Sequence, residues 1–322
     1  MTTPLLTVEN LTLNYRTGGD PVQALRGVSL TARAGEVLGI VGESGCGKST
    51  LAATLMGLAG TNAEITDGAV SFRGENILTA REETRRKLRG KHIAMVFQDP
   101  MTAFNPVLTI GAQLVDFQHN SGTPKRQRHS AARDMLDRVG IPDPDICMGR
   151  FPHELSGGMR QRAAIAAALL MQPEILIADE PTTALDVTME AQIIHLLRNL
   201  QSDYDGAIII VTHQLGVIAQ LCDRVVVMYA GQVVEEADVD TLFHAPRHPY
   251  TKALIACDPA SLSIKEKRLP TIGGRPPDLA HPPAGCAFAD RCAQVEPICR
   301  TAAPPRVEIG PDHIAKCHEA WS

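Results

Sequence analysis

The sequence has 322 residues, which is enough for one large domain with a smaller one or for two modest domains. Hydrophobic residues make up 44% of it and charged residues 21%, which are ordinary values for a globular protein that buries a core. The 31 Lys and Arg residues against 36 Asp and Glu residues give a formal net charge of -5, and this balance gives no reason to expect a nucleic-acid partner.

The apolar runs of the chain are short. The longest lies around residues 163–171 and falls well below the roughly 20 residues that a helix needs to span a bilayer. The N-terminus has no basic region followed by an apolar core, so we expect no secretory signal. We therefore expect the protein to stay in the cytoplasm and to meet a membrane only through a partner.

Short apolar runs and turns alternate through the first half of the chain. Residues 5–15 alternate apolar and polar side chains, which is typical of a half-buried strand. The elements expected next, in chain order, are a strand at 35–42, a glycine-rich turn, a helix at about 49–58, strands at 69–78 and 92–98, and a helical stretch at 109–140 that is broken at Gly122–Pro124.

The second half begins with an alanine-rich helix expected at 157–171, with Ser156 as its N-cap. The runs at 175–180 and 207–213 are almost entirely apolar, which indicates strands buried on both faces of a parallel sheet. Helices are expected at about 188–201 and 214–222. Strands that alternate with helices predict an α/β layered domain.

The composition changes after Phe243. The segment that follows contains three Pro-Pro pairs and five of the eight cysteines, four of them in the short span 286–317. It is predicted to be a small, irregular C-terminal extension that needs a cross-link, such as a bound metal, to hold its shape. We place the boundary between a main domain at residues 1–245 and this extension at residues 246–322.

A phosphate-binding loop is predicted between the strand at 35–42 and the helix after it. The motif G-x-x-x-x-G-K-[ST] is matched by Gly42-Glu43-Ser44-Gly45-Cys46-Gly47-Lys48-Ser49, and Thr50 follows it. Glycines let successive N–H groups surround a phosphate at a helix N-terminus. Lys48 is expected to supply a cation to the β- and γ-phosphates, and the Ser49 hydroxyl to ligate Mg²⁺.

An acidic pair is predicted at the carboxyl end of the buried strand at 175–180, where open α/β sheets bind ligands. Asp179 is suited to hold Mg²⁺ directly or through water, and Glu180 to polarise the attacking water. An apolar run that ends in Asp-Glu is a weak signal by itself. Paired with the phosphate loop, it predicts ATP binding and hydrolysis.

The segment 155–162, Leu-Ser-Gly-Gly-Met-Arg-Gln-Arg, opens the alanine-rich helix. Ser156, Gly157 and Gly158 at a helix start form a second anion site. The segment resembles the signature motif of ABC ATPases, which implies a P-loop NTPase fold with an inserted helical subdomain, here near residues 99–160. The resemblance also implies that this site binds the γ-phosphate held by an opposite subunit.

Other residues stand where the ABC family places functional groups. Gln98 resembles the Q-loop glutamine, which senses Mg²⁺ and the attacking water. Ala184-Leu185-Asp186 resembles the D-loop at the dimer interface, and His213 resembles the switch histidine that contacts the γ-phosphate. Tyr15 stands where an aromatic residue stacks on adenine in this family; the alternative is a packing residue at a strand end.

Two stretches narrow the resemblance to importers of oligopeptides and dipeptides. They are residues 97–106 around Gln98, and residues 245–254, which open the extension. Nickel, glutathione and opine importers share both stretches. The resemblance implies two transmembrane permease subunits, a second and homologous ATPase, an indirect solute receptor, and a place at the cytoplasmic face of the inner membrane.

Four cysteines of the extension form a candidate metal site: Cys286, Cys292, Cys299 and Cys317. A cytosolic location disfavours disulfides, and the spacings are wider than those of most zinc sites. Four thiolates can ligate an iron–sulfur cluster, and the peptide importers that the chain resembles carry a [4Fe–4S] cluster in this region. Zinc and the absence of any metal stay open. Cys46, Cys147, Cys222 and Cys257 are interpreted as ordinary residues.

Three rival functions stay open at this level. A soluble ABC ATPase that acts on ribosomes or DNA usually carries two ATPase units or a long coiled coil, and neither is visible in the sequence. An exporter motor is disfavoured by the unfused chain and by the extension. A nucleotide-sensing module without catalysis is disfavoured by the presence of Glu180 and His213.

Overall fold

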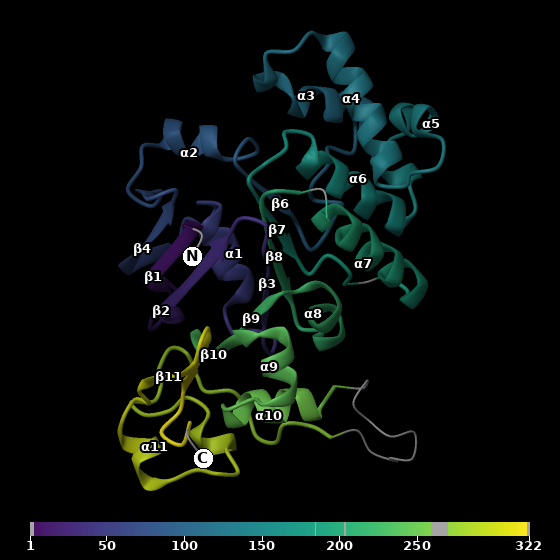
Figure 1. The fold of residues 1–322 in the computed structure, drawn as a ribbon. Helices are drawn as coiled ribbons and strands as arrows, with labels where there is room; N and C mark the ends of the chain where they lie inside the picture. Colours follow the sequence, from purple (N-terminus) through teal and green to yellow (C-terminus); the bar gives the residue numbers. More distant parts are fainter. Residues whose placement is uncertain (1–2, 184, 203, 259–269, 321–322) are drawn as a thin grey trace. The chain divides into compact units, whose positions relative to one another are not determined.

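The structure is a computed structural model that describes residues 3–183, 185–202, 204–258 and 270–320. Its chain forms two compact units, one made of residues 1–79 with 211–322 and the other of residues 80–210 (Figure 1). The first unit is therefore built from both ends of the chain. The boundary proposed at residue 245 falls inside it.

The first unit contains an antiparallel sheet of four strands in the order β2-β1-β4-β5. These are β1 (Pro4–Tyr15), β2 (Val22–Arg33), β4 (Ala63–Phe72) and β5 (Glu75–Asn76). The strand expected at 5–15 is confirmed as β1. β2 is absent from the elements expected from the sequence, because register shifts along the β1–β2 pair interrupt the alternation of buried and exposed side chains.

A second group of strands in the first unit surrounds β3 (Val37–Val41). It pairs in parallel with β9 (Arg224–Tyr229), and β9 pairs antiparallel with β10 (Gln232–Asp238). Every residue of β3 and β9 is buried, as expected for strands covered on both faces.

The C-terminal extension is more regular than expected, since it contributes strands to this group. β12 (His313–Lys316) pairs antiparallel with β10 and with β11 (Arg306–Gly310). Among the described residues, the helices of this unit are α1 (Lys48–Leu55), α8 (Leu215–Leu221), α9 (Val239–His244), α10 (Pro249–Ala256), η4 (Ala289–Arg291) and α11 (Pro297–Thr301).

The second unit joins a strand pair to a group of helices. β6 (Ile93–Val96) and β7 (Ile175–Asp179) pair in parallel, and β7 is fully buried. The helices are α2 (Glu82–Leu88), α3 (Ile110–Phe117), η1 (His119–Ser121), α4 (Lys125–Arg138), α5 (Pro144–Gly149), η2 (Pro152–Glu154), α6 (Gly157–Leu169) and α7 (Val187–Ser202). α3, α4 and α5 pack on one another, and α3 and α4 also pack on α6 (Figure 1), in the region where the helical subdomain was expected.

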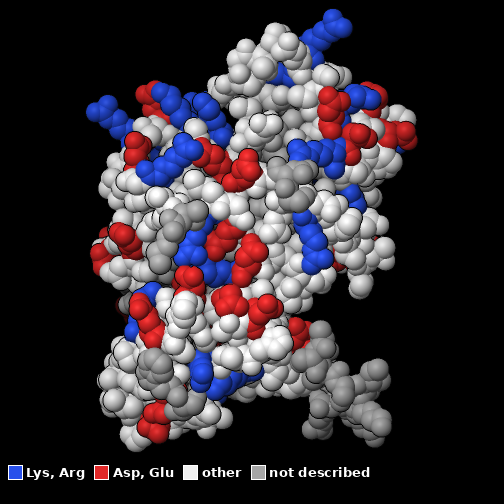
Figure 2. Space-filling view, viewed as in Figure 1, with Lys and Arg blue, Asp and Glu red and all other residues white. Residues whose placement is uncertain are grey.

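Strand β8 (Ala207–Thr212) runs across the boundary of the two units and is buried along its length, as expected for 207–213. On the face shown in Figure 2, acidic and basic side chains are interspersed. Within the described residues, we find no helix with both the length and the apolar character that crossing a membrane requires.

Candidate active site

The predicted phosphate loop lies between β3 and α1, as the motif requires. Its glycines meet the backbone of neighbouring strands. A Cβ atom on Gly42 would lie 2.1 Å from the Met228 carbonyl oxygen. Gly47, the residue before α1, has a φ of 104°, and a Cβ there would lie 2.6 Å from the Ala24 carbonyl oxygen. Only glycine fits these positions, so the loop presents its backbone rather than side chains.

Lys48 is held inside the loop that it follows. Its Nζ donates to the carbonyl oxygens of Gly42 at 2.7 Å and of Glu43 at 3.2 Å, and its side chain is buried. The Cys46 side chain is buried beside it, with its Sγ 3.9 Å from that Nζ. Burial of the Cys46 thiol raises its pKa, so it stays neutral and adds no charge beside the lysine.

Tyr15 lies next to the helix that the phosphate loop opens. Its hydroxyl donates to Oγ1 of Thr50 at 3.4 Å, across the gap between the end of β1 and the first turn of α1. The tyrosine is partly exposed. This contact joins Tyr15 and Thr50, which the sequence assigned separately to the nucleotide site.

The acidic pair stands at the carboxyl end of β7 in the second unit. Asp179 is buried, and Glu180 has a φ of 47°, a left-handed backbone conformation that costs free energy for a non-glycine residue. Gln98 Nε2 donates to Glu180 Oε2 at 3.0 Å, and Thr183 Oγ1 donates to the same oxygen at 2.8 Å. Two predicted catalytic residues, 82 positions apart in the chain, therefore meet directly.

Ser156 caps α6 as predicted, since its side chain accepts a hydrogen bond from the Met159 N–H at 3.3 Å. Gly157 faces open space, whereas a Cβ on Gly158 would lie 1.5 Å from the Met189 Cε of α7. A side chain at position 158 would therefore displace the end of the Met189 side chain, whereas one at position 157 would meet no other atom within 4 Å.

Two further predicted residues follow buried strands of the sheet. The Asp186 side chain accepts from the Met189 N–H at 2.9 Å and so caps the start of α7. Ala184 of the predicted D-loop lies outside the described residues. His213 directly follows β8, belongs to the first unit and is exposed.

Family comparisons agree with this geometry. A family model described as "ABC transporter" matches residues 25–183, and one described as "Oligopeptide/dipeptide transporter, C-terminal region" matches residues 234–299. A third, described as an AAA domain and putative AbiEii toxin, matches residues 150–219 and so overlaps the first over residues 150–183.

Curated relatives extend the likeness over nearly the whole chain. The chain is 46% identical over 314 residues to the dipeptide transport ATP-binding protein DppD of Lactococcus lactis subsp. cremoris, and the match covers 97% of this chain and 90% of that protein. The chain belongs to the ABC transporter ATPase family. It is also 45% identical over 317 residues to the oligopeptide transport ATP-binding protein OppD of Bacillus subtilis, with coverage of 98% and 88%.

Solved structures show the same fold for this ABC ATPase. The dimeric post-hydrolysis structure of the ATP-binding cassette MJ0796 with ADP and Pi matches with a TM-score of 0.65 and 29% identity, over 73% of this chain and 98% of that one. The structure of cbiO1 from Clostridium perfringens matches with a TM-score of 0.64 and 30% identity, over 75% and 91%.

The four cysteines of the extension line one cavity of the ABC ATPase, together with His248 and Phe288. All four are free thiols. Burial, with smaller contributions from the neighbouring cysteines, raises the pKa of the Cys286 thiol to about 11. Across the described residues, no group of three or more His, Cys, Asp or Glu side chains is arranged to hold a metal ion. The donors expected for a cluster are thus gathered without a ready-made metal geometry.

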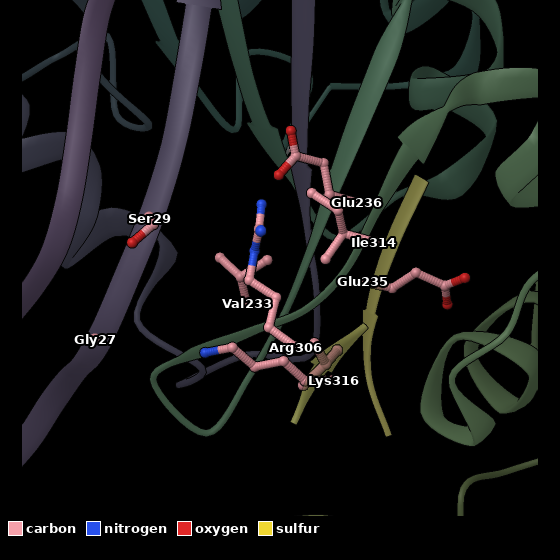
Figure 3. A pocket seen from close by; sticks show the side chains of 9 residues that line it. Gly27, Ser29, Val233, Glu235, Glu236, Arg306, Ile314 and Lys316 are labelled. Atoms are coloured by element: carbon pink, nitrogen blue, oxygen red, sulfur yellow. The ribbon is translucent and has the colours of Figure 1, made fainter. Parts of the chain in front are cut away.

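A second cavity of the first unit is lined by residues of β2, β10, β11 and β12, and none of these is a predicted site residue. Figure 3 shows the long side chains of Arg306 and Lys316 reaching into it from β11 and β12, while Glu235 points away. Burial lowers the pKa of Lys316, and the nearby guanidinium groups of Arg306 and Arg26 lower it further.

Two residues beside the phosphate loop of this ABC ATPase were not predicted. Tyr250 and Arg291 both contact Glu43, at separations of 207 and 248 residues along the chain. No local motif connects residues so far apart, so the sequence carried no signal for either contact.

Proposed function

We propose that this ABC ATPase powers the import of dipeptides or oligopeptides at the cytoplasmic face of the inner membrane. Two supports are its identity to transport proteins named for these solutes and the family model for the oligopeptide/dipeptide C-terminal region. On this proposal residues 1–245 form the ATPase domain, residues 246–322 are the extension typical of this branch, and the partners are two permeases, a homologous ATPase and, indirectly, a solute receptor.

The observation that carries the catalytic part is the setting of Glu180. A carboxylate at the end of a buried strand, held by Gln98 and Thr183, is positioned to orient and polarise a water molecule. Backbone strain at this residue is the kind that is retained at functional sites. We assign Glu180 as the base, and Gln98 and His213 as residues that contact the attacking water and the γ-phosphate.

The phosphate loop fits ATP with Mg²⁺ by its chemistry. Its glycines leave no side chain over the backbone N–H groups, and Lys48 is already held within the loop. Mg²⁺ prefers oxygen ligands, and we assign to it the Ser49 hydroxyl, the Asp179 carboxylate and the Gln98 amide oxygen. The ion would neutralise charge on the β- and γ-phosphates. Tyr15 is assigned to the adenine.

A complete site requires a second subunit on this proposal. The Ser156 helix start of one subunit would face the phosphate loop of the other, with Asp186 near the interface. The MJ0796 cassette to which the chain is similar is described as dimeric. Binding of ATP would then close the dimer and hydrolysis would open it, with the Gln98 region passing the motion to a permease.

Affinity capture of the chain from detergent-solubilised membranes, followed by mass spectrometry, tests the transport function. We expect two multispanning permeases, a second ABC ATPase and a solute receptor in the captured material. Identifying the ligand of that receptor would show whether the imported solute is a peptide, nickel, glutathione or an opine. Capture of ribosomal or DNA-repair proteins without any membrane protein would overturn the transport proposal and leave the ATPase intact.

We further propose that the cavity lined by Cys286, Cys292, Cys299 and Cys317 holds a [4Fe–4S] cluster as a structural staple. Four thiols on one cavity are the donor set that such a cluster requires. Iron and acid-labile sulfide should be present in protein purified without oxygen and should be lost when the cysteines are replaced by serine. Zinc without sulfide, or no metal at all, would contradict the cluster.

A further inference from the structure

The second residue of the phosphate loop is held by the C-terminal region at two points. Arg291 Nη1 donates to Glu43 Oε2 at 2.6 Å, and its Nη2 donates to Oε1 at 2.8 Å. Tyr250 accepts a hydrogen bond on its hydroxyl from the Glu43 N–H at 2.8 Å. Both the side chain and the backbone of Glu43 are therefore fixed by residues beyond position 245.

Arg291 has a single defined position. Its side chain is 3% exposed, and each guanidinium nitrogen has a partner. Besides Glu43, Nε donates to the Gly273 carbonyl at 2.8 Å, Nη2 to the Ile272 carbonyl at 3.1 Å and Nη1 to the Tyr229 hydroxyl at 3.2 Å. A planar guanidinium that pairs with both oxygens of a carboxylate constrains its orientation as well as its position.

Aromatic rings support the two residues that hold Glu43. The Arg291 guanidinium lies 5.7 Å from the centre of the Tyr229 ring and 5.8 Å from that of Phe288. Tyr250 contacts the same two rings, with centroid distances of 4.6 Å to Tyr229 and 5.4 Å to Phe288. Phe288 also lines the cavity of the four cysteines. The extension thus presents a rigid surface to the phosphate loop.

The held residue is also one of the anchors of the loop lysine. Lys48 Nζ donates to the carbonyl oxygens of Glu43 and of Gly42 before it. A shift of Glu43 would move these carbonyls and the adjacent N–H groups together. Because phosphate binding depends on the positions of backbone groups and of the lysine, a shift of this kind weakens nucleotide binding.

We propose that Arg291 and Tyr250 are positioning residues of the nucleotide site, so that the C-terminal extension sets the conformation of the phosphate loop. This inference rests on the proposed function of the loop in ATP binding. Neither residue is assigned a contact with the nucleotide. Their effect passes through Glu43, and their loss weakens ATP binding more than it slows the chemical step.

Arg291→Lys and Tyr250→Phe test the proposal, with Arg300→Lys as the matched control. Lysine keeps the charge and loses the two-pronged contact, and phenylalanine removes one oxygen. Arg300 lies in the same extension but pairs with Asp290 on the surface. We expect the dissociation constant for Mg-ATP to rise about tenfold in Arg291→Lys and several-fold in Tyr250→Phe, with kcat changed by less than about threefold. The control should bind like the parent.

A double variant separates positioning from a general loss of stability. If Arg291 acts through Glu43, Glu43→Gln with Arg291→Lys should bind ATP no more weakly than the weaker single variant. If the double variant instead raised the dissociation constant by the product of the two single effects, Arg291 and Glu43 would not act through one shared contact. The proposal would be overturned if Tyr250→Phe and folded Arg291→Lys both bound ATP within twofold of the parent. If Arg291→Lys does not fold, the result for Tyr250→Phe alone decides. A parent protein without ATPase activity would instead refute the proposed function.

Discussion

At the scale of single residues, the proposed catalytic arrangement depends on one carboxylate held in a strained conformation. Glu180 follows the buried β7 with a positive φ, and two neutral donors, the Gln98 amide and the Thr183 hydroxyl, bind one of its oxygens. Neutral donors orient a carboxylate and leave its charge in place. The two donors thus orient the carboxylate in a way that suits the proposed base that polarises water.

Glu180→Gln should therefore leave ATP binding nearly unchanged and lower ATP turnover by about 100-fold or more, because the amide cannot accept a proton. The measurement is steady-state ATPase activity beside the dissociation constant for Mg-ATP. Glu83→Gln, on the exposed surface of α2, is the control and should keep normal turnover. Normal turnover in Glu180→Gln would show that another group is the base.

At the scale of elements, α10 begins with a buried cap. The ring Nδ1 of His248 accepts from the Tyr250 N–H at 3.0 Å, and the His248 N–H donates to the buried carboxylate of Glu235 at 2.9 Å. Burial, together with a smaller effect of the positive charge of Lys252, lowers the pKa of His248 to about 3. Nδ1 can accept this hydrogen bond only when the imidazole ring is neutral. The cap and the lowered pKa therefore both keep His248 uncharged in the folded chain.

This cap predicts a pH dependence of stability. The unfolded chain binds a proton at His248 near its ordinary pKa of 6.5, while the folded chain does not until about pH 3. Protonation of the unfolded chain therefore leaves the free energy of unfolding unchanged well above pH 6.5 and lowers it as the pH falls from 6.5 towards 3. Between pH 7 and pH 5 the free energy of unfolding should fall by about 2 kcal/mol. His248→Asn keeps an accepting cap without this titration. Its melting temperature should fall less than that of the parent over the same range; equal falls would contradict the assignment.

At the scale of the whole molecule, the extension is continuous with the first unit. β12 pairs with β10, as in Glu235 opposite Ala315, and His313 Nε2 donates to the same buried Glu235 carboxylate at 2.9 Å. Tyr250 and Arg291 meet the phosphate loop in the same unit. A part that the composition marks as separate is thus held by strand pairing, buried polar contacts and the loop itself.

Truncation after residue 245 should accordingly damage the part that remains. It would expose the edge of β10 and leave the buried Glu235 carboxylate without its partners, which is costly for a charged group. We expect aggregation or a melting temperature lower by at least about 10 °C, with weakened nucleotide binding. A soluble fragment with the melting temperature and ATP affinity of the full chain would show that the extension is an independent appendage.

The local elements of the candidate nucleotide site were predictable because their form depends on neighbouring residues. The glycines and Lys48 of the predicted phosphate loop, the Asp179–Glu180 pair and the Ser156 cap each occupy one continuous stretch. The structure confirms the elements around them: a turn between β3 and α1, the end of a buried strand, and the N-cap of α6. Spacing within a strand–turn–helix determines where such groups point. The buried strands were predictable for a similar reason, since a run of apolar residues records burial directly.

The contacts between distant segments were decided by tertiary structure alone. The pairing of β12 with β10, the cavity shared by four cysteines, and the hold of Tyr250 and Arg291 on Glu43 all join residues with no fixed spacing between them. Periodicity reports whether a residue is buried, but not which residue it meets. Those partners follow from the way the strands and the aromatic rings of Tyr229, Tyr250 and Phe288 pack in three dimensions.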